Sequence, residues 1–160
     1  MLLDVNNVKK IFGRGLNATT ALNGMSFNVD RGEFVAIMGE SGSGKSTLLN
    51  LIATYDKATE GTITIDAQNI RQLRNKEIAY FRRDHLGFVF QDFNILPTMT
   101  NKDNILMPLV LANRSHQTMR HRLYRLSYQL HIEPLLNKYP FEISGGEQQR
   151  VAICRALINE

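Results

Sequence analysis

The stretch that decides the fold reads Gly39-Glu40-Ser41-Gly42-Ser43-Gly44-Lys45-Ser46-Thr47. It fits the pattern G-x-x-x-x-G-K-[ST] of a phosphate-binding loop. Glycines in such a loop let the backbone adopt positive φ angles and turn its N–H groups inward, toward an anion. An accidental match is expected in only about one chain in a few hundred of this length. The stretch therefore predicts a site for the phosphates of a nucleoside triphosphate.

The side chains at the end of this loop have separate expected roles. Lys45 supplies a positive charge for the β and γ phosphates, and the dipole of a helix starting near Gly44 adds to it. Ser46 offers a hydroxyl to Mg²⁺, which takes few protein oxygens and keeps several waters. Thr47 can contact an oxygen of the α phosphate. The remaining positions contribute mainly backbone N–H groups to the site: Gly39, Glu40, Ser41, Gly42 and Ser43.

The surrounding sequence has the alternating texture of an α/β domain. The apolar run Phe34–Met38 before the loop predicts a strand buried on both faces, and Lys45–Ala53 after it has helical spacing. Further strands are predicted at Leu2–Val8, Ala21–Val29, Gly61–Asp66 and Leu86–Phe90. Further helices are predicted at Gln72–Asp84, Asn101–Ala112, Ser115–His131 and Gly146–Asn159.

Composition limits the class of protein. A chain of 160 residues with 21% charged residues is typical of one globular domain. Its start lacks the long apolar stretch of a signal peptide, and no apolar run is long enough to span a bilayer. The basic residues are scattered apart from Arg114–Arg125, which we interpret as a solvated helix face. The single cysteine, Cys154, excludes an internal disulfide framework and is expected to be a packed core residue.

A second motif, Ile143-Ser144-Gly145-Gly146-Glu147-Gln148-Gln149-Arg150, separates the possible phosphate-loop proteins. Ser144 and Glu147 have the spacing of a capping box, which specifies a helix start. Here the sequence resembles the ATP-binding subunits of ABC transporters, whose signature is a Leu-Ser-Gly-Gly-Gln type motif that opens a helix. Ile143 and Glu147 depart from that pattern. The resemblance implies ATP as the triphosphate and implies that four residues contact an ATP held by a second subunit: Ser144, Gly145, Gly146 and Glu147.

Two other positions gain a role from the resemblance. Gln91 follows the predicted strand Leu86–Phe90, where the family has a glutamine that reaches Mg²⁺ and the attacking water and senses the transmembrane partner. Phe12 lies ahead of the strands, where the family has an aromatic ring that stacks on adenine. Such stacking is worth about 1–3 kcal/mol and tolerates different rings. From the residues alone, an ordinary strand-end glutamine and a core phenylalanine remain alternatives.

The resemblance extends over the whole chain and implies its fold and partners. The fold is an α/β phosphate-loop NTPase core with an N-terminal antiparallel β subdomain and a helical subdomain. The β subdomain and the phosphate-loop core cover about residues 1–92, and the helical subdomain with the signature covers about residues 93–160. The implied partners are a second, head-to-tail ATP-binding subunit and a transmembrane permease, with no nucleic acid. The implied location is peripheral, on the cytoplasmic face of the cell membrane.

One subgroup of the family is most similar, on the stretch RRDHLGFVFQDFNILPTMTNKDNILMPL at residues 82–109. Its members serve lipoprotein release, macrolide export, and peptide-antibiotic export or resistance. The implied function is ATP binding and hydrolysis coupled to export or detoxification of such a substrate. The small-molecule kinase and GTPase classes are excluded by the signature motif.

The family pattern continues past the signature with a strand ending in Asp-Glu, which supplies the catalytic glutamate, and with a switch histidine. The sequence ends at Glu160 without these motifs, and its four histidines precede the signature. We therefore expect a domain that is incomplete at its C-terminus, with an exposed apolar edge. Its catalytic set is incomplete, with Lys45 and Gln91 contributing, and we expect little ATP hydrolysis. The alternatives are an inactive ATP-binding remnant and a non-transport ABC ATPase that acts on nucleic acid.

Overall fold

The computed structural model describes residues 1–159, which form two compact units. The first unit covers Met1–Tyr80, and the second begins at Phe81. Helix α2 (Asn75–His85) contains the boundary between them. Each unit carries part of the predicted site, so each is described by itself.

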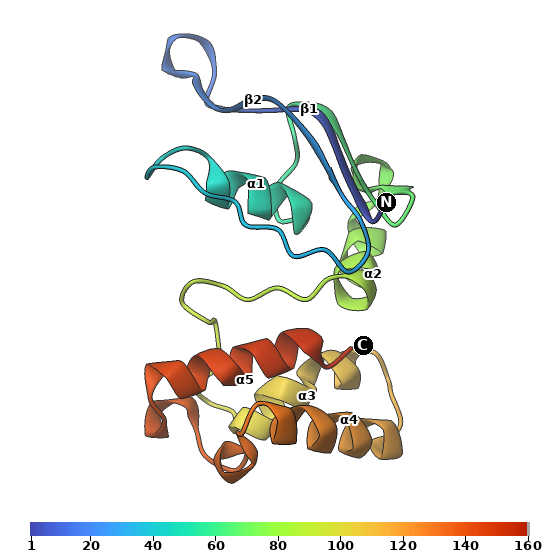
Figure 1. Ribbon diagram of the computed structural model, residues 1–160, viewed down its shortest axis with the longest axis vertical. Coiled ribbons are helices and arrows are strands. Elements are labelled where there is room, and N and C mark those ends of the chain that lie inside the picture. Colours follow the sequence, from blue (N-terminus) through green and yellow to red (C-terminus); the bar gives the residue numbers. More distant parts are fainter. Residues whose placement is uncertain (160) are drawn as a thin grey trace. The chain divides into compact units, whose positions relative to one another are not determined.

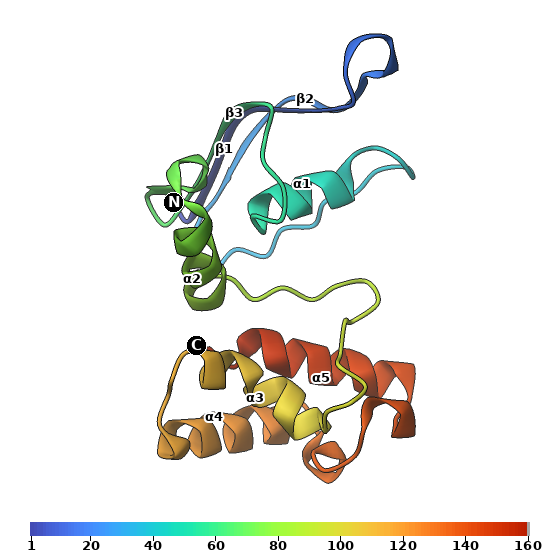
Figure 2. The same ribbon diagram turned by 180° about the vertical axis from the view of Figure 1, so that it is seen from behind.

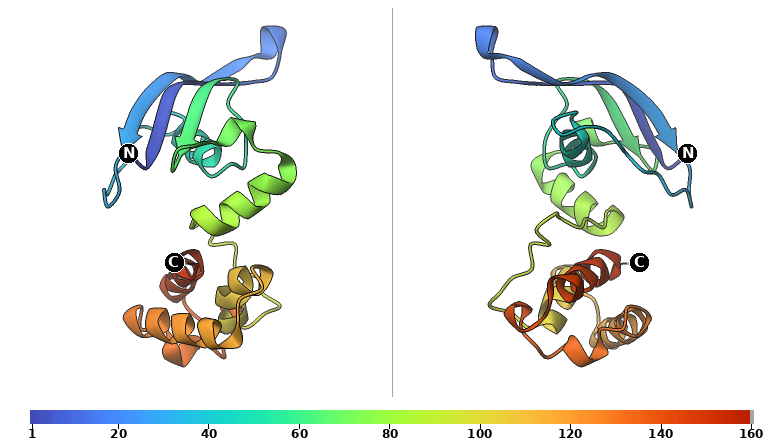
Figure 3. Two further views of the ribbon diagram at one scale, coloured as in Figure 1. Left: turned by 90° about the vertical axis from the view of Figure 1, so that its right-hand side faces the viewer. Right: turned by 60° about the vertical axis from the view of Figure 1, so that its left-hand side comes forward.

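The first unit is an antiparallel sheet with a helix against one face (Figure 1). Its strands are β1 (Leu3–Phe12), β2 (Thr19–Val29), β3 (Glu60–Ile65) and β4 (Gln68–Asn69), in the order β2-β1-β3-β4. Leu3 of the central strand β1 pairs with Val29 on one side and Ile65 on the other. The sheet curves over α1 (Lys45–Ile52), as Figure 3 shows from two sides. Buried side chains of both elements fill the space between them: Val5, Val8, Leu22, Leu48, Leu51, Ile63 and Ile65.

The predicted strand at Phe34–Met38 is wrong for this structure. The segment is irregular, and the side chains of Phe34 and Met38 are 96% and 88% exposed. A strand needs a neighbour to receive its N–H and C=O groups, and an apolar run of this kind is stable as a strand only with both faces covered. Among the described residues, this segment pairs with no strand.

The same correction applies to Leu86–Phe90 in the second unit, which is also irregular. Its aromatic side chains Phe88 and Phe90 contact each other edge to face, with ring centroids 4.7 Å apart. Gly87 lies so close to the backbone of Ala156 that an added Cβ would be 2.5 Å from its carbonyl oxygen. The segment is therefore held against the last helix although it forms no strand.

The second unit is a helical bundle of α3 (Asn101–Leu111), α4 (His116–Gln129) and α5 (Gly145–Leu157), which Figure 2 shows from behind. These helices confirm the predicted ones to within about two residues at each end, the usual uncertainty of helix boundaries. Their apolar faces and two adjoining residues outside them, Ile132 and Ile158, share one core with Ile105, Leu109, Leu123, Leu126, Val151 and Cys154. Short 3-10 helices complete the two units: η1 (Gly15–Asn17), η2 (Ile70–Gln72), η3 (Glu133–Leu135) and η4 (Pro140–Glu142).

Two details of the second unit follow directly from the sequence. Thr100 and Ser115 accept hydrogen bonds from Asp103 N and Thr118 N, and so cap the first turns of α3 and α4. On α4, Arg120 and Arg125 are exposed, as expected for a solvated basic face, whereas Arg122 is half-buried and donates to the Ile158 carbonyl oxygen at 3.0 Å. None of the helices described in residues 1–159 is long and apolar enough to cross a membrane.

Candidate functional site: a phosphate loop and a glycine-opened helix

The predicted phosphate loop connects the irregular segment after β2 to the first residue of α1. Gly42 and Gly44 have φ angles of 81° and 90°, in the left-handed region that favours glycine. Gly44 also lies against β2, because an added Cβ would be 2.5 Å from the Ala21 carbonyl oxygen. Gly42 is thus required by its backbone geometry alone, and Gly44 by both backbone geometry and close packing. They turn the chain so that α1 begins directly behind the loop.

Lys45 closes this loop through its side chain. Its Nζ donates to the carbonyl oxygens of Gly39 and Glu40, at 2.8 and 2.6 Å, and to Ser43 Oγ at 3.3 Å. An ammonium group has three N–H donors, so all of them are directed at the loop itself. A phosphate that enters the loop must replace at least one of these contacts. The Lys45 ammonium is therefore a donor that could exchange a loop carbonyl for a phosphate oxygen.

The start of α1 suits an anion and a magnesium ion. Its first N–H groups have no partner within the helix, and the helix dipole places partial positive charge there. Ser46, the second residue of α1, is exposed and presents its hydroxyl at the same end. Since Mg²⁺ keeps most of its ligands as water and phosphate oxygens, one serine hydroxyl fits its requirement. Ser46 would be the protein ligand, and Thr47 follows it as a half-buried residue of the first turn.

Phe12 lies at the end of β1 and not ahead of the strands, which corrects its predicted position. It pairs with Thr19 of β2 at the base of the β1–β2 connection, and its side chain is 45% exposed. Lys10 Nζ lies 4.9 Å from the centroid of its ring. An aromatic ring that is partly exposed at a strand end can receive a flat ligand. Phe12 and the phosphate loop belong to the same unit.

In the second unit, the glycine-opened motif forms the first turn of α5 as the capping box predicts. Glu147 Oε2 accepts hydrogen bonds from Ser144 N at 2.8 Å and from Ser144 Oγ at 2.7 Å. The hydrogen bonds from the Ser144 hydroxyl and N–H lower the pKa of the Glu147 carboxyl, which stays ionised at the helix N-terminus. Gly145 and Gly146 have open space where a side chain would be. The backbone N–H groups of this turn are therefore accessible to an anion.

Gln91 is exposed in a turn after the irregular segment Leu86–Phe90. The backbone just beyond it is held by Arg155 of α5, which the sequence analysis did not identify. The guanidinium donates to the carbonyl oxygens of Phe93 and Asn94, each at 2.7 Å. Both of these residues have positive φ angles, 59° and 46°. Arg155 thereby fixes a strained turn next to Gln91 from the helix that the signature opens.

Asn104 of α3 holds the following part of the same segment and was also missed. Its side chain is fully buried. Its Oδ1 accepts from Leu96 N at 2.8 Å, and its Nδ2 donates to the carbonyl oxygens of Leu96, Met99 and Thr100. Asn104 thus replaces the hydrogen-bonding partners that the irregular backbone 96–100 lacks. Its only sequence signal was its place, one turn after Asn101, among the apolar residues of the predicted helix.

Comparison with known proteins assigns the phosphate loop and the signature motif to one family. The model of the family described as "ABC transporter" matches residues 22–160, which include both the phosphate loop and the signature. The chain belongs to the ABC transporter family. It thereby has the ATP-binding domain of this family, as the resemblance implied.

Curated relatives support the subgroup. The chain is 46% identical to the ABC transporter ATP-binding protein YxdL of Bacillus subtilis over 159 residues, 99% of this chain and 62% of that protein. It is 43% identical to the bacitracin export ATP-binding protein BceA of Halalkalibacterium halodurans, over 99% of this chain and 63% of that protein. The chain therefore spans less than two thirds of the length of these relatives.

A solved structure confirms the fold. The ABC transporter cassette MJ0796 of Methanocaldococcus jannaschii, solved as a dimer, matches with a TM-score of 0.90 at 42% identity. The match covers 99% of this chain and 70% of that chain. A second structure of the same cassette is described as a post-hydrolysis state bound to ADP and Pi. The predicted ABC ATPase fold, with its antiparallel β part and helical part, is confirmed.

Proposed function

We propose that the chain acts as the ATP-binding subunit of an ABC exporter. The observation that carries the proposal is the phosphate loop, in which the Lys45 ammonium lies against the loop carbonyls at the start of α1 and supports a triphosphate site there. ATP would lie with its phosphates on the backbone N–H groups of residues 39–47 and its adenine on Phe12. Mg²⁺ would bind the Ser46 hydroxyl.

A second ATP-binding subunit would complete each nucleotide site. The open first turn of α5, with Gly145 and Gly146, supports a role in contacting the phosphates of an ATP held by the other subunit. The ionised Glu147 stays engaged with Ser144, so the N–H groups rather than the carboxylate would face the ATP. In the same proposal, residues of about 1–92 hold the nucleotide and residues of about 93–160 contact the partners.

The whole protein would couple ATP hydrolysis to export at the cytoplasmic face of the membrane, together with a permease. Lys45 and Gln91 would contribute to hydrolysis, and the phosphate oxygens would be stabilised by loop N–H groups and Mg²⁺. The substrate class we favour is a peptide antibiotic, because BceA is named for bacitracin export. Macrolides and lipoproteins are the competing substrates of the subgroup.

Equilibrium binding of Mg-ATP to the full chain tests the central step. Lys45→Ala removes a charged donor, so we expect the Kd for ATP to rise at least about tenfold. Lys102→Ala, at an exposed lysine of α3, is the matched control and should leave the Kd unchanged. Phosphate release is measured in the same samples, because steady release that is lost in Lys45→Ala would exclude an inactive remnant. Equal ATP binding by the Lys45→Ala variant would contradict the proposed site.

A further inference from the structure

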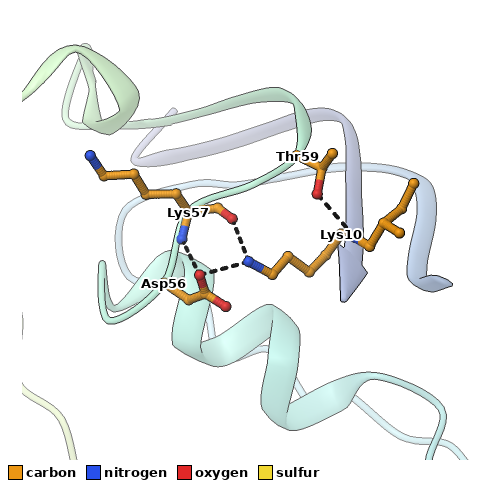
Figure 4. Close-up of polar contacts among 5 residues, drawn as sticks. Lys10, Asp56, Lys57 and Thr59 are labelled. Atoms are coloured by element: carbon orange, nitrogen blue, oxygen red, sulfur yellow. Dashed lines mark hydrogen bonds and ion pairs between the residues drawn. The ribbon is translucent and has the colours of Figure 1, made fainter. Parts of the chain in front are cut away.

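Lys10 is a lysine that the proposed function does not use, yet it lies in the interior of the first unit. It belongs to the central strand β1 and is only 9% exposed. Its Nζ donates to Asp56 Oδ1 at 2.6 Å and to the carbonyl oxygen of Lys57 at 2.8 Å (Figure 4). A lysine is rarely buried unless its charge is paired, and here both contacts satisfy it.

The acceptors of this amine are themselves held in place. Asp56 Oδ1 also accepts from Lys57 N at 2.7 Å, so one carboxylate oxygen joins the amine to the backbone, as Figure 4 shows. Burial alone would raise the pKa of Asp56, but the hydrogen bonds from Lys10 and from the Lys57 N–H outweigh it and lower the pKa. The carboxylate is therefore ionised at neutral pH. Thr59 Oγ1 accepts from Ile11 N at 3.0 Å and fixes the same connection against β1.

This connection links the two ends of the nucleotide site. The phosphate loop ends in the first turn of α1, and residues 56–59 come shortly after the end of that helix. Lys10 is two residues before Phe12 on β1, and its ammonium lies 4.9 Å from the centroid of the Phe12 ring. A continuous set of contacts thus runs from the phosphate loop through α1 to Asp56, then to Lys10 and to the ring.

We propose that Lys10 is a positioning residue for the adenine base: its ammonium, held by Asp56, occupies one face of the Phe12 ring and leaves the other face to the base. The inference rests on the proposed ATP site. An ammonium over an aromatic face is attracted by the negative potential of the ring, most strongly where the pair is shielded from water. Holding the ring in its bound orientation lowers the side-chain entropy lost when a base stacks on it.

The test compares two ligands, ATP and inorganic tripolyphosphate, which lacks the base. Lys10→Met keeps most of the unbranched side chain, ending one atom shorter, and removes its charge. We expect it to weaken ATP binding about three- to tenfold and to leave tripolyphosphate binding unchanged. In the Phe12→Ala background, the same substitution should have almost no further effect, because the ring it orients is gone. Lys9→Met is the control, since Lys9 is the adjacent lysine and pairs with Glu60 at 3.0 Å.

A spectroscopic signature separates ring positioning from a general structural role. The chain contains no tryptophan, so Phe12→Trp introduces a single reporter at the ring position. ATP should quench its fluorescence by stacking, whereas tripolyphosphate should not. Adding Lys10→Met should reduce the quenching at saturating ATP. If Lys10→Met does not fold, Asp56→Asn replaces it, because this variant keeps the lysine and removes only the carboxylate that holds it.

Several results would overturn the inference. Equal weakening of ATP and tripolyphosphate by Lys10→Met would mean that Lys10 acts on the phosphate loop, and unchanged ATP affinity would mean that it does not act on the base. Additive effects of the Lys10 and Phe12 substitutions would exclude action through the ring. Failure of the unsubstituted chain to bind either ligand would refute the proposed function, and the inference with it.

Discussion

Asn104 gives the sharpest quantitative prediction for the second unit. Its buried side chain takes part in four hydrogen bonds with the backbone of residues 96–100, at 2.8 to 3.3 Å. The amide oxygen accepts one of these bonds, and the amide nitrogen has two protons to share among three carbonyl oxygens. About three bonds therefore count fully, each worth about 1 kcal/mol net. Alanine has the better helix propensity and returns about 0.5 kcal/mol. Asn104→Ala should therefore lower the free energy of unfolding by about 2–3 kcal/mol.

Asn104→Asp is the more severe change although it has the same shape. It replaces the amide donors with a group that can only donate when protonated, and it places an oxygen opposite the carbonyl oxygens of Leu96 and Thr100. We expect a loss larger than that of Asn104→Ala at neutral pH, with partial recovery in mild acid, where the carboxyl protonates.

Urea unfolding followed by far-UV circular dichroism measures these differences. Gln117→Ala is the matched control, because it removes an amide from the exposed surface of α4 and should change stability by less than about 0.5 kcal/mol. The slope of the free energy against urea should stay constant, since the folded state is unchanged. An Asn104→Ala variant as stable as the Gln117→Ala control would refute the assignment of Asn104 as the anchor of this segment.

Three other predictions concern the remaining polar and sulfur groups. Arg155→Lys can satisfy only one of the carbonyls of Phe93 and Asn94 well, so it should lower stability by about 1–2 kcal/mol and speed amide hydrogen exchange beside Gln91; unchanged exchange would contradict this. Because the pKa of Asp56 is lowered from 3.8, its stabilising effect is present above that value and disappears as the pH falls through the lowered pKa. The difference in unfolding free energy between wild type and Asp56→Asn should therefore shrink in acid, and a pH-independent difference would oppose it. Burial raises the pKa of the Cys154 thiol to about 12, so thiol reagents near pH 8 should label the native chain at least about a hundredfold more slowly than the urea-unfolded chain; equal rates would place Cys154 outside the core.

The features that sequence reasoning located correctly are those set by local chemistry. The phosphate loop needs left-handed glycines at fixed positions, and its lysine starts the next helix, so nine residues specify its geometry. The capping box of Ser144 and Glu147 likewise depends on residues three apart and opens α5 as expected. Helices were found because their hydrogen bonds lie within one segment and their apolar residues repeat every three to four positions.

The strand predictions at Phe34–Met38 and Leu86–Phe90 failed for the opposite reason. An apolar run shows that a segment could be buried, but a strand is stable only through its neighbours. Strand β1 succeeds because β2 and β3 pair with it on both sides, whereas the described residues provide no such neighbour to either run. An apolar run therefore predicts that a segment tends to be extended and buried, and pairing with a neighbouring strand decides whether it becomes a strand.

The sequence did not reveal Asn104 and Arg155 as anchors of irregular segments, nor Lys10 as a neighbour of the Phe12 ring. All three act on a segment that only the folded structure brings to them. Each donates to the backbone of a segment outside the helices and strands, and for Lys10 and Arg155 the carbonyl partners lie 47 to 62 residues away. Irregular backbone has carbonyls that no helix or sheet satisfies, so a buried chain of this kind needs side-chain donors from elsewhere. The identity of the donor is visible in the sequence, but its target is set by packing. Only Lys10 carried a usable local signal, because its spacing of two residues from Phe12 on a strand allows both side chains to share one face. A strand-end aromatic such as Phe12 that precedes a phosphate loop can therefore be supported by the residue two positions before it on the same strand.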